Sequence, residues 1–563
     1  MKRKLLAGLL CTSVAATAQQ PLYIPDTLSG NTFSLTMHKD SVQFLPGNKT
    51  ATLAFNSNAY LGPTLLMQKG TNVNITVNNQ IGDTTNIHWH GLHVAPTNDG
   101  PRQNIMPGMS WNPQFLIMNN AATYWYHPHL HMKTALQALR GAAGLIIVRD
   151  NAENALPIPR KYGVDDFPIV VQSMQFDRQN QIDERGMEDS ILLVNGTLDP
   201  YLNAPAQVIR MRLLNASGER NFNFGFTTNK SFYVIGNDGG LLSAPVLVTR
   251  IRLSPGERAE ILLDLTGMNG QTLYLMSYAS ELPTGVQGGP TMLMPGGPPM
   301  NSPLNGIDFN ILKLNVVTQT ANPITTIPST LIPQTTLSAS QANATRKINF
   351  TADNMMVMDG PFYFNDSSYN ENRIDYKIPL NNIEIWELDN QTMVAHPFHI
   401  HDVQFNILSI NGNKPSAKEA GKKDVVMVPP MGTVKFIVKF EDFADSTTPY
   451  VYHCHILMHE DDGMMGQFLV MPSGSLDIKN VIAEGGISIY PNPAKDRITI
   501  SVKENNQGEL YVIQVKDLLG REIYNTTSKA TSVTLNTSAW NKGLYVITIA
   551  ASDKKFSKNV LIE

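Results

Sequence analysis

The placement of histidine constrains this chain more than any other feature of its sequence. Ten of the thirteen histidines fall into four short clusters, and each cluster contains a His-x-His pair. Residues i and i+2 of a β-strand face the same side, so each pair directs two imidazoles toward one place. Buried imidazoles need partners, and four such pairs are therefore hard to explain by packing alone. The clusters are His88-Trp89-His90, His127-Pro128-His129, His396-Pro397-Phe398-His399-Ile400-His401, and His453-Cys454-His455 followed by His459.

Short apolar runs separated by Gly, Pro and Asn predict an all-β fold. At ~150 residues per domain, the chain length corresponds to roughly three to four domains. We expect three β-sandwiches, over residues 19–150, 151–320 and 321–475, and a smaller β-sandwich over residues 476–563. In the three larger sandwiches, the runs that carry this prediction are 72–77, 145–148, 208–214, 259–265, 382–388 and 434–440.

Composition excludes several other classes of protein. A hydrophobic fraction of 42% is too high for a mainly disordered chain. No apolar run reaches the ~18 residues of a membrane span. A net charge of -4, with no basic run after the first few residues, argues against a nucleic-acid partner.

The N-terminus has the parts of a secretory signal peptide. The basic start Lys2-Arg3-Lys4 after Met1 precedes an apolar stretch and then Ala16-Thr17-Ala18, which predicts a removed segment over residues 1–18. Cys11 would leave with that segment. Cys454 is then the only cysteine of the mature chain, and a lone thiol in an exported protein is either a hazard or a ligand.

The sequence His453-Cys454-His455 predicts two metal sites one residue apart, because on a strand the histidines face one side and the cysteine faces the other. Cys454, His396 and His459 form a His₂Cys set, and Met464 can add a weak axial thioether, which is the ligand set of blue copper. Zinc sites do not use an axial methionine, and zinc does not transfer electrons. The eight other clustered histidines suit several coppers with positions open to O₂.

Together these motifs resemble the three-domain multicopper oxidases, the family of laccases, bilirubin oxidases and copper-efflux oxidases. H-W-H-G, W-Y-H-P-H, H-P-F-H-I-H and H-C-H-x-x-x-H-x-x-x-x-M occur in the family's order, over roughly residues 40–472. The resemblance implies cupredoxin-like Greek-key sandwiches and four copper ions. It assigns His396, Cys454, His459 and Met464 to the type 1 copper, His88 and His399 to the type 2 copper, and His90, His127, His129, His401, His453 and His455 to the type 3 pair.

The C-terminal segment resembles the sorting domain of type IX secretion. It opens with Tyr490-Pro491-Asn492-Pro493, has a turn at Gly520-Arg521 and continues to a strand at Gly543-Leu544-Tyr545-Val546. The resemblance implies the type IX machinery as a partner, with export through the periplasm to the cell surface or the medium. A carbohydrate-binding or adhesion sandwich is the alternative. We expect the mature protein to be a monomer.

The family resemblance implies an oxidase of phenols, aryl amines or similar small reductants. Electrons would reach the type 1 copper through His459 or His396, and O₂ would be reduced to water at the other three coppers. Asp99 and Glu460 match acidic residues that the family places near those coppers, which implies proton relays; solvated surface carboxylates are the alternative. His38, His93 and His131 lie outside the ligand set.

Other functions stay open. A cuprous oxidase for copper detoxification would bind Cu(I) through soft thioethers, although each methionine can equally be a gap-filling residue. Copper-efflux oxidases place an acidic and a Met ligand where this chain has Thr392-Met393-Val394, and the chain lacks their long Met/His-rich insert. A copper-free structural or assembly protein on the same fold would have lost ligand residues. A copper nitrite reductase does not need four His-x-His pairs. The candidate methionines are Met292, Met294, Met300, Met355, Met356, Met358 and Met393.

Overall fold

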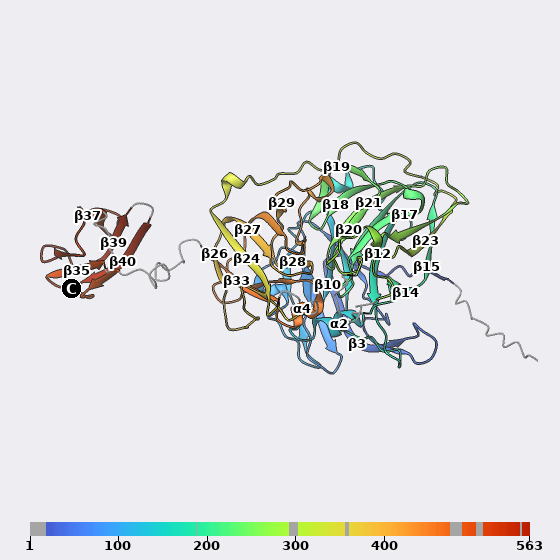
Figure 1. Ribbon diagram of the computed structural model, residues 1–563, viewed down its shortest axis with the longest axis horizontal. Coiled ribbons are helices and arrows are strands. Elements are labelled where there is room, and N and C mark those ends of the chain that lie inside the picture. Colours follow the sequence, from blue (N-terminus) through green and yellow to red (C-terminus); the bar gives the residue numbers. More distant parts are fainter. Residues whose placement is uncertain are drawn as a thin grey trace, which may run out of the picture. The chain divides into compact units, whose positions relative to one another are not determined.

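A computed structural model describes residues 19–186, 188–291, 302–354, 360–472, 487–502, 510–551 and 554–563. The chain divides into two compact units at Met471 and Pro472 (Figure 1). The predicted signal peptide with Cys11 lies outside the described residues, as do all the candidate methionines except Met393. Nearly all of the regular secondary structure in both units is β-strand, which confirms the all-β prediction.

The first sandwich packs two sheets around one apolar core. β6 illustrates why its sequence forms such a layer, since Val73, Ile75 and Val77 are buried and the residues between them face outward. One sheet contains β4 (Thr50–Phe55), β3 (Thr32–Val42), β6 (Asn72–Gln80), β8 (Ser110–Trp111) and β9 (Gln114–Leu116). The other contains β2 (Thr27–Ser29), β5 (Thr64–Gln68), β11 (Gly144–Arg149), β10 (Ala122–His127) and β7 (His88–His90).

The second sandwich has the largest sheets, and its outermost strand β1 comes from the start of the described chain. One sheet has the order β1 (Gln20–Pro21), β15 (Pro200–Pro205), β23 (Phe309–Val317), β22 (Thr272–Ser277), β17 (Phe222–Phe226) and β20 (Ile251–Leu253). The other has the order β14 (Thr197–Leu198), β13 (Ile191–Val194), β12 (Asp166–Met174), β16 (Val208–Asn215), β21 (Arg258–Asp264), β18 (Phe232–Asn237) and β19 (Gly240–Val248).

The third sandwich encloses a core rich in aromatic rings, with Trp386 at its centre. One sheet has the order β25 (Phe362–Phe364), β24 (Ala344–Ala352), β27 (Ile383–Asn390), β31 (Thr433–Lys439) and β29 (Asn406–Ile410). The other has the order β26 (Tyr376–Pro379), β33 (Met465–Met471), β32 (Tyr450–Cys454), β28 (His396–Ile400) and β30 (Val425–Val428). The predicted boundaries between the sandwiches stay predictions.

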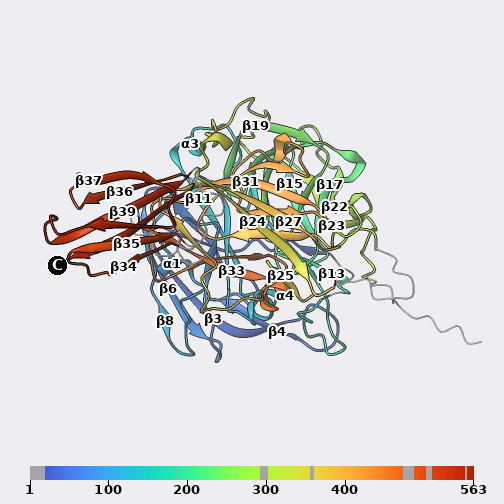
Figure 2. The same ribbon diagram turned by 60° about the vertical axis from the view of Figure 1, so that its left-hand side comes forward.

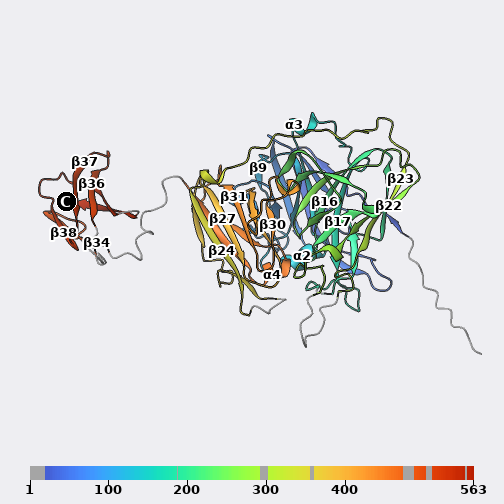
Figure 3. The same ribbon diagram turned by 45° about the horizontal axis from the view of Figure 1, so that its top comes forward.

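Helices are short and few in the described chain. Figures 1 and 3 show α2 beside α4, where Thr134 at the start of α2 donates a hydrogen bond to Glu460 of α4. No described helix is long and apolar enough to cross a membrane. The α-helices are α1 (Pro96–Asp99), α2 (Thr134–Leu139), α3 (Asn151–Asn154) and α4 (Leu457–Asp461), and the 3₁₀ helices are η1 (Thr227–Asn229), η2 (Ala279–Glu281), η3 (Ala339–Gln341) and η4 (Ala417–Glu419).

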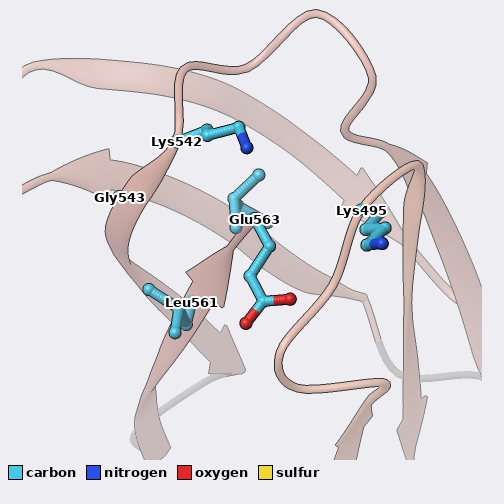
Figure 4. A pocket seen from close by; sticks show the side chains of 6 residues that line it. Lys495, Lys542, Gly543, Leu561 and Glu563 are labelled. Atoms are coloured by element: carbon cyan, nitrogen blue, oxygen red, sulfur yellow. The ribbon is translucent and has the colours of Figure 1, made fainter.

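The C-terminal unit is a small sandwich with its own core, whose two layers are visible in Figure 2. Figure 4 shows a pocket of this unit at the C-terminal residue Glu563, lined also by Lys495 and Lys542. The lining residues of this pocket include no histidine or cysteine. The sheets are β34 (Ile487–Tyr490), β35 (Arg497–Val502) and β38 (Ser532–Asn536), and β37 (Glu522–Ser528), β36 (Tyr511–Asp517), β39 (Gly543–Ala551) and β40 (Lys554–Ile562).

An ion pair between the first and third sandwiches involves His93. Its Nδ1 lies 2.7 Å from Asp402 Oδ1, and its Nε2 lies 3.1 Å from Asp442 Oδ2. Burial disfavours the charged ring, but the two carboxylates outweigh that effect and raise the pKa of His93 to about 9. Burial also raises the pKa of Asp402, to about 6. Both partners are therefore mainly charged between about pH 6.5 and 9.

We expect His93→Gln to destabilise the copper-free protein by up to about 3 kcal/mol at pH 6.5, and by little at pH 10. A raised histidine pKa contributes stability that is complete below the ordinary value of about 6.5 and is lost as the pH rises through 9. Thermal unfolding of the variant and the unsubstituted protein across this range measures the difference. His38→Gln is the control, because its ring contacts the backbone carbonyls of Lys39 and Asn56. An equal loss at pH 6.5 and pH 10 would contradict the assignment.

Candidate metal centre

Strand pairing brings the four histidine clusters together from the first and third sandwiches. In the first sandwich, His127 of β10 pairs with His88 of β7. In the third, His399 of β28 pairs with His453 of β32, and Phe398 pairs with Cys454. The ten clustered histidines and Cys454 are all buried. Each His-x-His pair therefore points into the protein rather than toward solvent.

The cysteine group lies inside the third sandwich. Cys454 Sγ is 3.6 Å from His396 Nδ1 and 3.6 Å from His459 Nδ1. Met464 is fully buried beside this group, since its carbonyl accepts the Cys454 N–H and its own N–H donates to the His459 carbonyl. The ring of Phe362 packs against both imidazoles, at centroid distances of 4.7 and 4.6 Å. The two Nδ1 atoms and the thiol thus converge in an apolar enclosure.

Burial sets the charge of these groups. It raises the pKa of the Cys454 thiol well above its usual range and lowers the pKa of His459 to about 3. Without a metal, the group is therefore a neutral thiol with neutral imidazoles. A cation that takes up the thiolate would displace the thiol proton and restore charge balance in this dry site.

The other eight histidines form three neighbouring groups. In one group, His90 Nδ1 lies 3.4 Å from His127 Nε2 and 3.3 Å from His455 Nε2. In the second, the Nε2 atoms of His129 and His401 lie 3.1 and 3.4 Å from His453 Nε2. In the third, the ligand nitrogens of His88 and His399 lie within 4.8 Å of one another and of His401.

These histidines fit a cluster of metal ions. His88 Nε2 and His399 Nε2 are buried and have no hydrogen-bond partner, which is costly unless a ligand occupies them. Burial and, to a lesser extent, neighbouring imidazoles lower the pKa values of His90, His127, His129, His399, His401, His453 and His455 well below the ordinary value. Converging neutral imidazoles are the form that binds transition metals.

The remaining ring nitrogens are held mainly by oxygen atoms. His88 and His399 contact the carbonyls of Asp99 and Asp424 through Nδ1, at 3.0 and 2.8 Å. His127 Nδ1 contacts the Pro128 carbonyl at 2.8 Å, and His453 Nδ1 contacts the Cys454 carbonyl at 2.9 Å. Such contacts fix the tautomer and the ring orientation of metal-binding histidines.

Asp99 and Glu460 lie beside the histidine groups, and both side chains are buried rather than solvated. Asp99 Oδ2 is 2.7 Å from His401 Nδ1. Glu460 accepts a hydrogen bond from Thr134 Oγ1 at 2.7 Å, and its Oε2 is 3.2 Å from His453 Nδ1. Burial raises the pKa of Glu460 well above its ordinary value.

The three unassigned histidines lie outside these groups. His131 packs edge-on against Tyr369 at 5.0 Å, His93 forms the ion pair described above, and His38 contacts backbone carbonyls. Met393 is half-buried just before the cysteine group. Thr392 comes directly before Met393 in the chain and two positions after Asn390. Its Oγ1 lies 2.9 Å from His396 Nε2 and so orients that ring.

Sequence reasoning missed the contribution of the second sandwich, which supplies no histidine. Gly256, in the turn between β20 and β21, lies against His455, since a Cβ at this position would be 2.7 Å from the imidazole ring. Arg258 follows on β21 and forms a buried ion pair with Asp424. The one available signal was the charged pair Lys423-Asp424, directly before the apolar run Val425–Val428.

A Cys-His₂ group next to a cluster of eight histidines is a set of side chains that suits copper. Comparison with known proteins agrees. Family profiles described as "Multicopper oxidase" match residues 36–153, 162–291 and 333–474. A profile described as "Secretion system C-terminal sorting domain" matches residues 488–563. The chain therefore belongs to the multicopper oxidase family and carries a type IX sorting domain.

Individual relatives extend this result. The multicopper oxidase mco of Staphylococcus haemolyticus is 34% identical over 448 residues, 78% of this chain and 88% of the relative. The cell division protein FtsP of Escherichia coli K12 is 32% identical over 469 residues, covering 81% and 94%.

Solved structures agree with the cupredoxin-like fold. A laccase-like multi-copper oxidase CueO from Ochrobactrum sp. superposes with a TM-score of 0.71 at 30% identity, covering 80% of this chain and 100% of the other. A multicopper oxidase from Campylobacter jejuni, described as a metallo-oxidase, superposes with a TM-score of 0.65 at 25% identity, covering 81% and 94%.

We expect Gly256→Ala to weaken copper binding at the histidine cluster, because the new methyl group must displace the His455 ring. Copper retained per chain, measured after dialysis against a chelator, should fall. Gly267→Ala is a matched control: Gly267 also has a positive φ and lies in the second sandwich, but a Cβ there meets nothing within 4 Å. Equal copper loss in both variants would attribute the effect to backbone strain instead.

Proposed function

We propose that this chain is a laccase-like oxidase that takes single electrons from phenols, aryl amines or similar reductants and reduces O₂ to water. The side chains of His396, Cys454, His459 and Met464 would hold a type 1 copper. His88 and His399 would hold a type 2 copper, and a type 3 pair would be held by His90, His127, His129, His401, His453 and His455. Copper at these positions would supply one-electron transfer at the cysteine group and O₂ binding at the histidine cluster.

The observation that carries the proposal is the covalent connection between the two groups. Cys454 belongs to the first, and its chain neighbours His453 and His455 belong to the second. Each neighbour contacts a different histidine group, so the backbone of one residue links the cysteine to two of the three groups. No diffusing carrier is needed between the two groups.

Access favours His459 as the residue that meets the reductant. His396 is fully buried, and Thr392 occupies its Nε2. His459 is 6% exposed, the larger value of the two. Cys454 is fully buried and Phe362 packs against both imidazoles, so a reductant would approach through the small exposed part of His459.

Two carboxyl groups can handle the protons that O₂ reduction consumes. Glu460 can hold a proton at an oxygen 3.2 Å from His453 Nδ1, and Thr134 connects Glu460 to the start of α2. Asp99 accepts from His401 on another side of the cluster. We propose both as proton relays, in a monomeric enzyme that is exported through the periplasm and secreted or kept at the cell surface.

A cuprous oxidase is the second candidate, favoured by the similarity to the Campylobacter jejuni metallo-oxidase. Thr392 argues against it, because it lies in the segment where copper-efflux oxidases place an acidic ligand for Cu(I). Its hydroxyl instead lies within hydrogen-bonding distance of His396. Comparing turnover on Cu(I) with turnover on a bulky phenol separates the two: a Cu(I) rate far above the phenol rate would favour detoxification. The similarity to FtsP keeps an assembly role open, but this chain retains all twelve ligand side chains.

We expect Cys454→Ser to abolish the blue absorption and reduce oxidase turnover to background, while copper at the histidine cluster is retained. Visible spectroscopy and copper analysis of the purified variant measure both effects. Met464→Leu, which alters a buried neighbour and keeps the thiolate, should stay blue. A Cys454→Ser protein that remains blue, or that still oxidises phenols, would refute the proposed function.

We expect Glu460→Gln and Asp99→Asn each to lower turnover by about 10²-fold and to change its pH profile, because each removes a group able to carry a proton. Steady-state O₂ consumption across pH measures this. Asp462→Asn, an exposed substitution at the end of α4, should leave the profile unchanged. Unaltered turnover and profile in the two buried variants would remove both residues from the proton path.

A further inference from the structure

One histidine of the cluster uses a different nitrogen from the rest. Seven of the eight direct Nε2 toward their group, whereas His90 directs Nδ1, at 3.4 Å from His127 and 3.3 Å from His455. Its Nε2 lies instead 3.1 Å from Asp424 Oδ1. A neutral imidazole carries one proton, so Nδ1 can offer a lone pair only if the proton is on Nε2.

Asp424 supplies what that tautomer needs. An ionised carboxylate only accepts hydrogen bonds, so the side chain of Asp424 favours the proton on His90 Nε2. The backbone carbonyl of the same residue accepts from His399 Nδ1 at 2.8 Å. One residue therefore orients two rings, one in each of two neighbouring histidine groups.

Asp424 is itself held by Arg258. Arg258 Nη1 and Nη2 contact the two carboxylate oxygens at 2.6 Å each, and both side chains are fully buried. Arg258 also donates to the Thr123 carbonyl at 3.1 Å and the Gly256 carbonyl at 3.0 Å. This two-pronged geometry fixes the plane of the carboxylate, which a single point charge would not do.

Close packing holds the Asp424–Arg258 ion pair in place. Gly91 directly follows His90, and a Cβ on Gly91 would lie 2.6 Å from Asp424 Oδ2 and 2.7 Å from Arg258 Nη2. On the far side, Asp238 Oδ1 accepts the backbone N–H of Arg258 at 2.7 Å, and Asp238 Oδ2 contacts Lys423 Nζ at 3.0 Å. The pair is thus fixed by residues of all three sandwiches.

We infer that Asp424 and Arg258 are positioning residues that hold His90 with its proton on Nε2 and its Nδ1 free for metal. The second sandwich, which supplies no metal ligand, then sets the geometry of the cluster through Arg258. This inference rests on the proposed function for the identity of the metal. The tautomer itself is a property of the metal-free protein.

Asp424→Asn tests the inference, because a neutral amide is a weaker acceptor and can also present N–H groups to His90. In copper-free protein with ¹⁵N-labelled histidine rings, long-range ¹⁵N–¹H correlation should show the His90 proton on Nε2 in the unsubstituted chain, and partly or wholly on Nδ1 in the variant. Copper at the histidine cluster should be lost to a chelator at about 10–100-fold lower chelator concentration. The blue band of the Cys454 site should persist.

Asp166→Asn is the matched control. Asp166 is also fully buried and also pairs with an arginine through both oxygens, at 2.8 and 3.0 Å from Arg212, but neither residue contacts a clustered histidine. It should lose stability and keep both its copper and the His90 tautomer. An unchanged tautomer and copper retention in Asp424→Asn, or equal copper loss in Asp166→Asn, overturns the inference.

A double variant, Arg258→Met with Asp424→Leu, covers the case in which the single variant does not fold. Replacing a buried ion pair by apolar residues removes both charges and leaves neither one unpaired. The inference predicts a folded, blue protein whose histidine cluster still loses copper easily; full copper retention overturns it. If the unsubstituted protein neither turns blue nor retains copper, the proposed function fails, while the tautomer measurement still tests the positioning role.

Discussion

The alternation of side chains along β32 is the constraint on which the rest of the site depends. His453 and, directly after the strand, His455 face one way and Cys454 faces the other, so one short segment serves two groups of candidate ligands. Every other ligand must then reach one side or the other of this strand. β28, its hydrogen-bonded neighbour, does so with His396 on the cysteine side and His399 on the histidine side, where His401 follows directly after the strand.

Burial of these imidazoles and of the thiol costs free energy and restricts the charge states that they can adopt. Imidazoles and a thiol taken out of water must stay neutral or bind a cation, and the lowered histidine pKa values follow from that requirement. The oxygen atoms behind the rings then decide which nitrogen is free. For most rings that oxygen is a backbone carbonyl, which the fold provides without a dedicated side chain.

The convergence of the candidate ligand side chains could be predicted from the sequence because the pattern that places them is local. His-x-His pairs on strands share a face whatever the rest of the fold does, and the six apolar runs of the larger unit all lie in or overlap strands. The supporting residues could not be predicted in this way. Arg258 and Asp424 are 166 positions apart, and only the packing of the second sandwich against the third brings them together. The sequence places His93 outside the ligand set, but its ion pair could not be predicted. Its two acidic partners, Asp402 and Asp442, are more than 300 positions away.

The central claim is that Cys454 couples a one-electron site to a cluster that reduces O₂ completely. The ratio of reductant oxidised to O₂ consumed by the copper-loaded full-length protein tests it most directly. With a one-electron phenol or aryl amine, the account predicts about four equivalents per O₂ and no hydrogen peroxide. A ratio of about two, with peroxide accumulating, would contradict it, because O₂ would then be leaving the cluster half reduced.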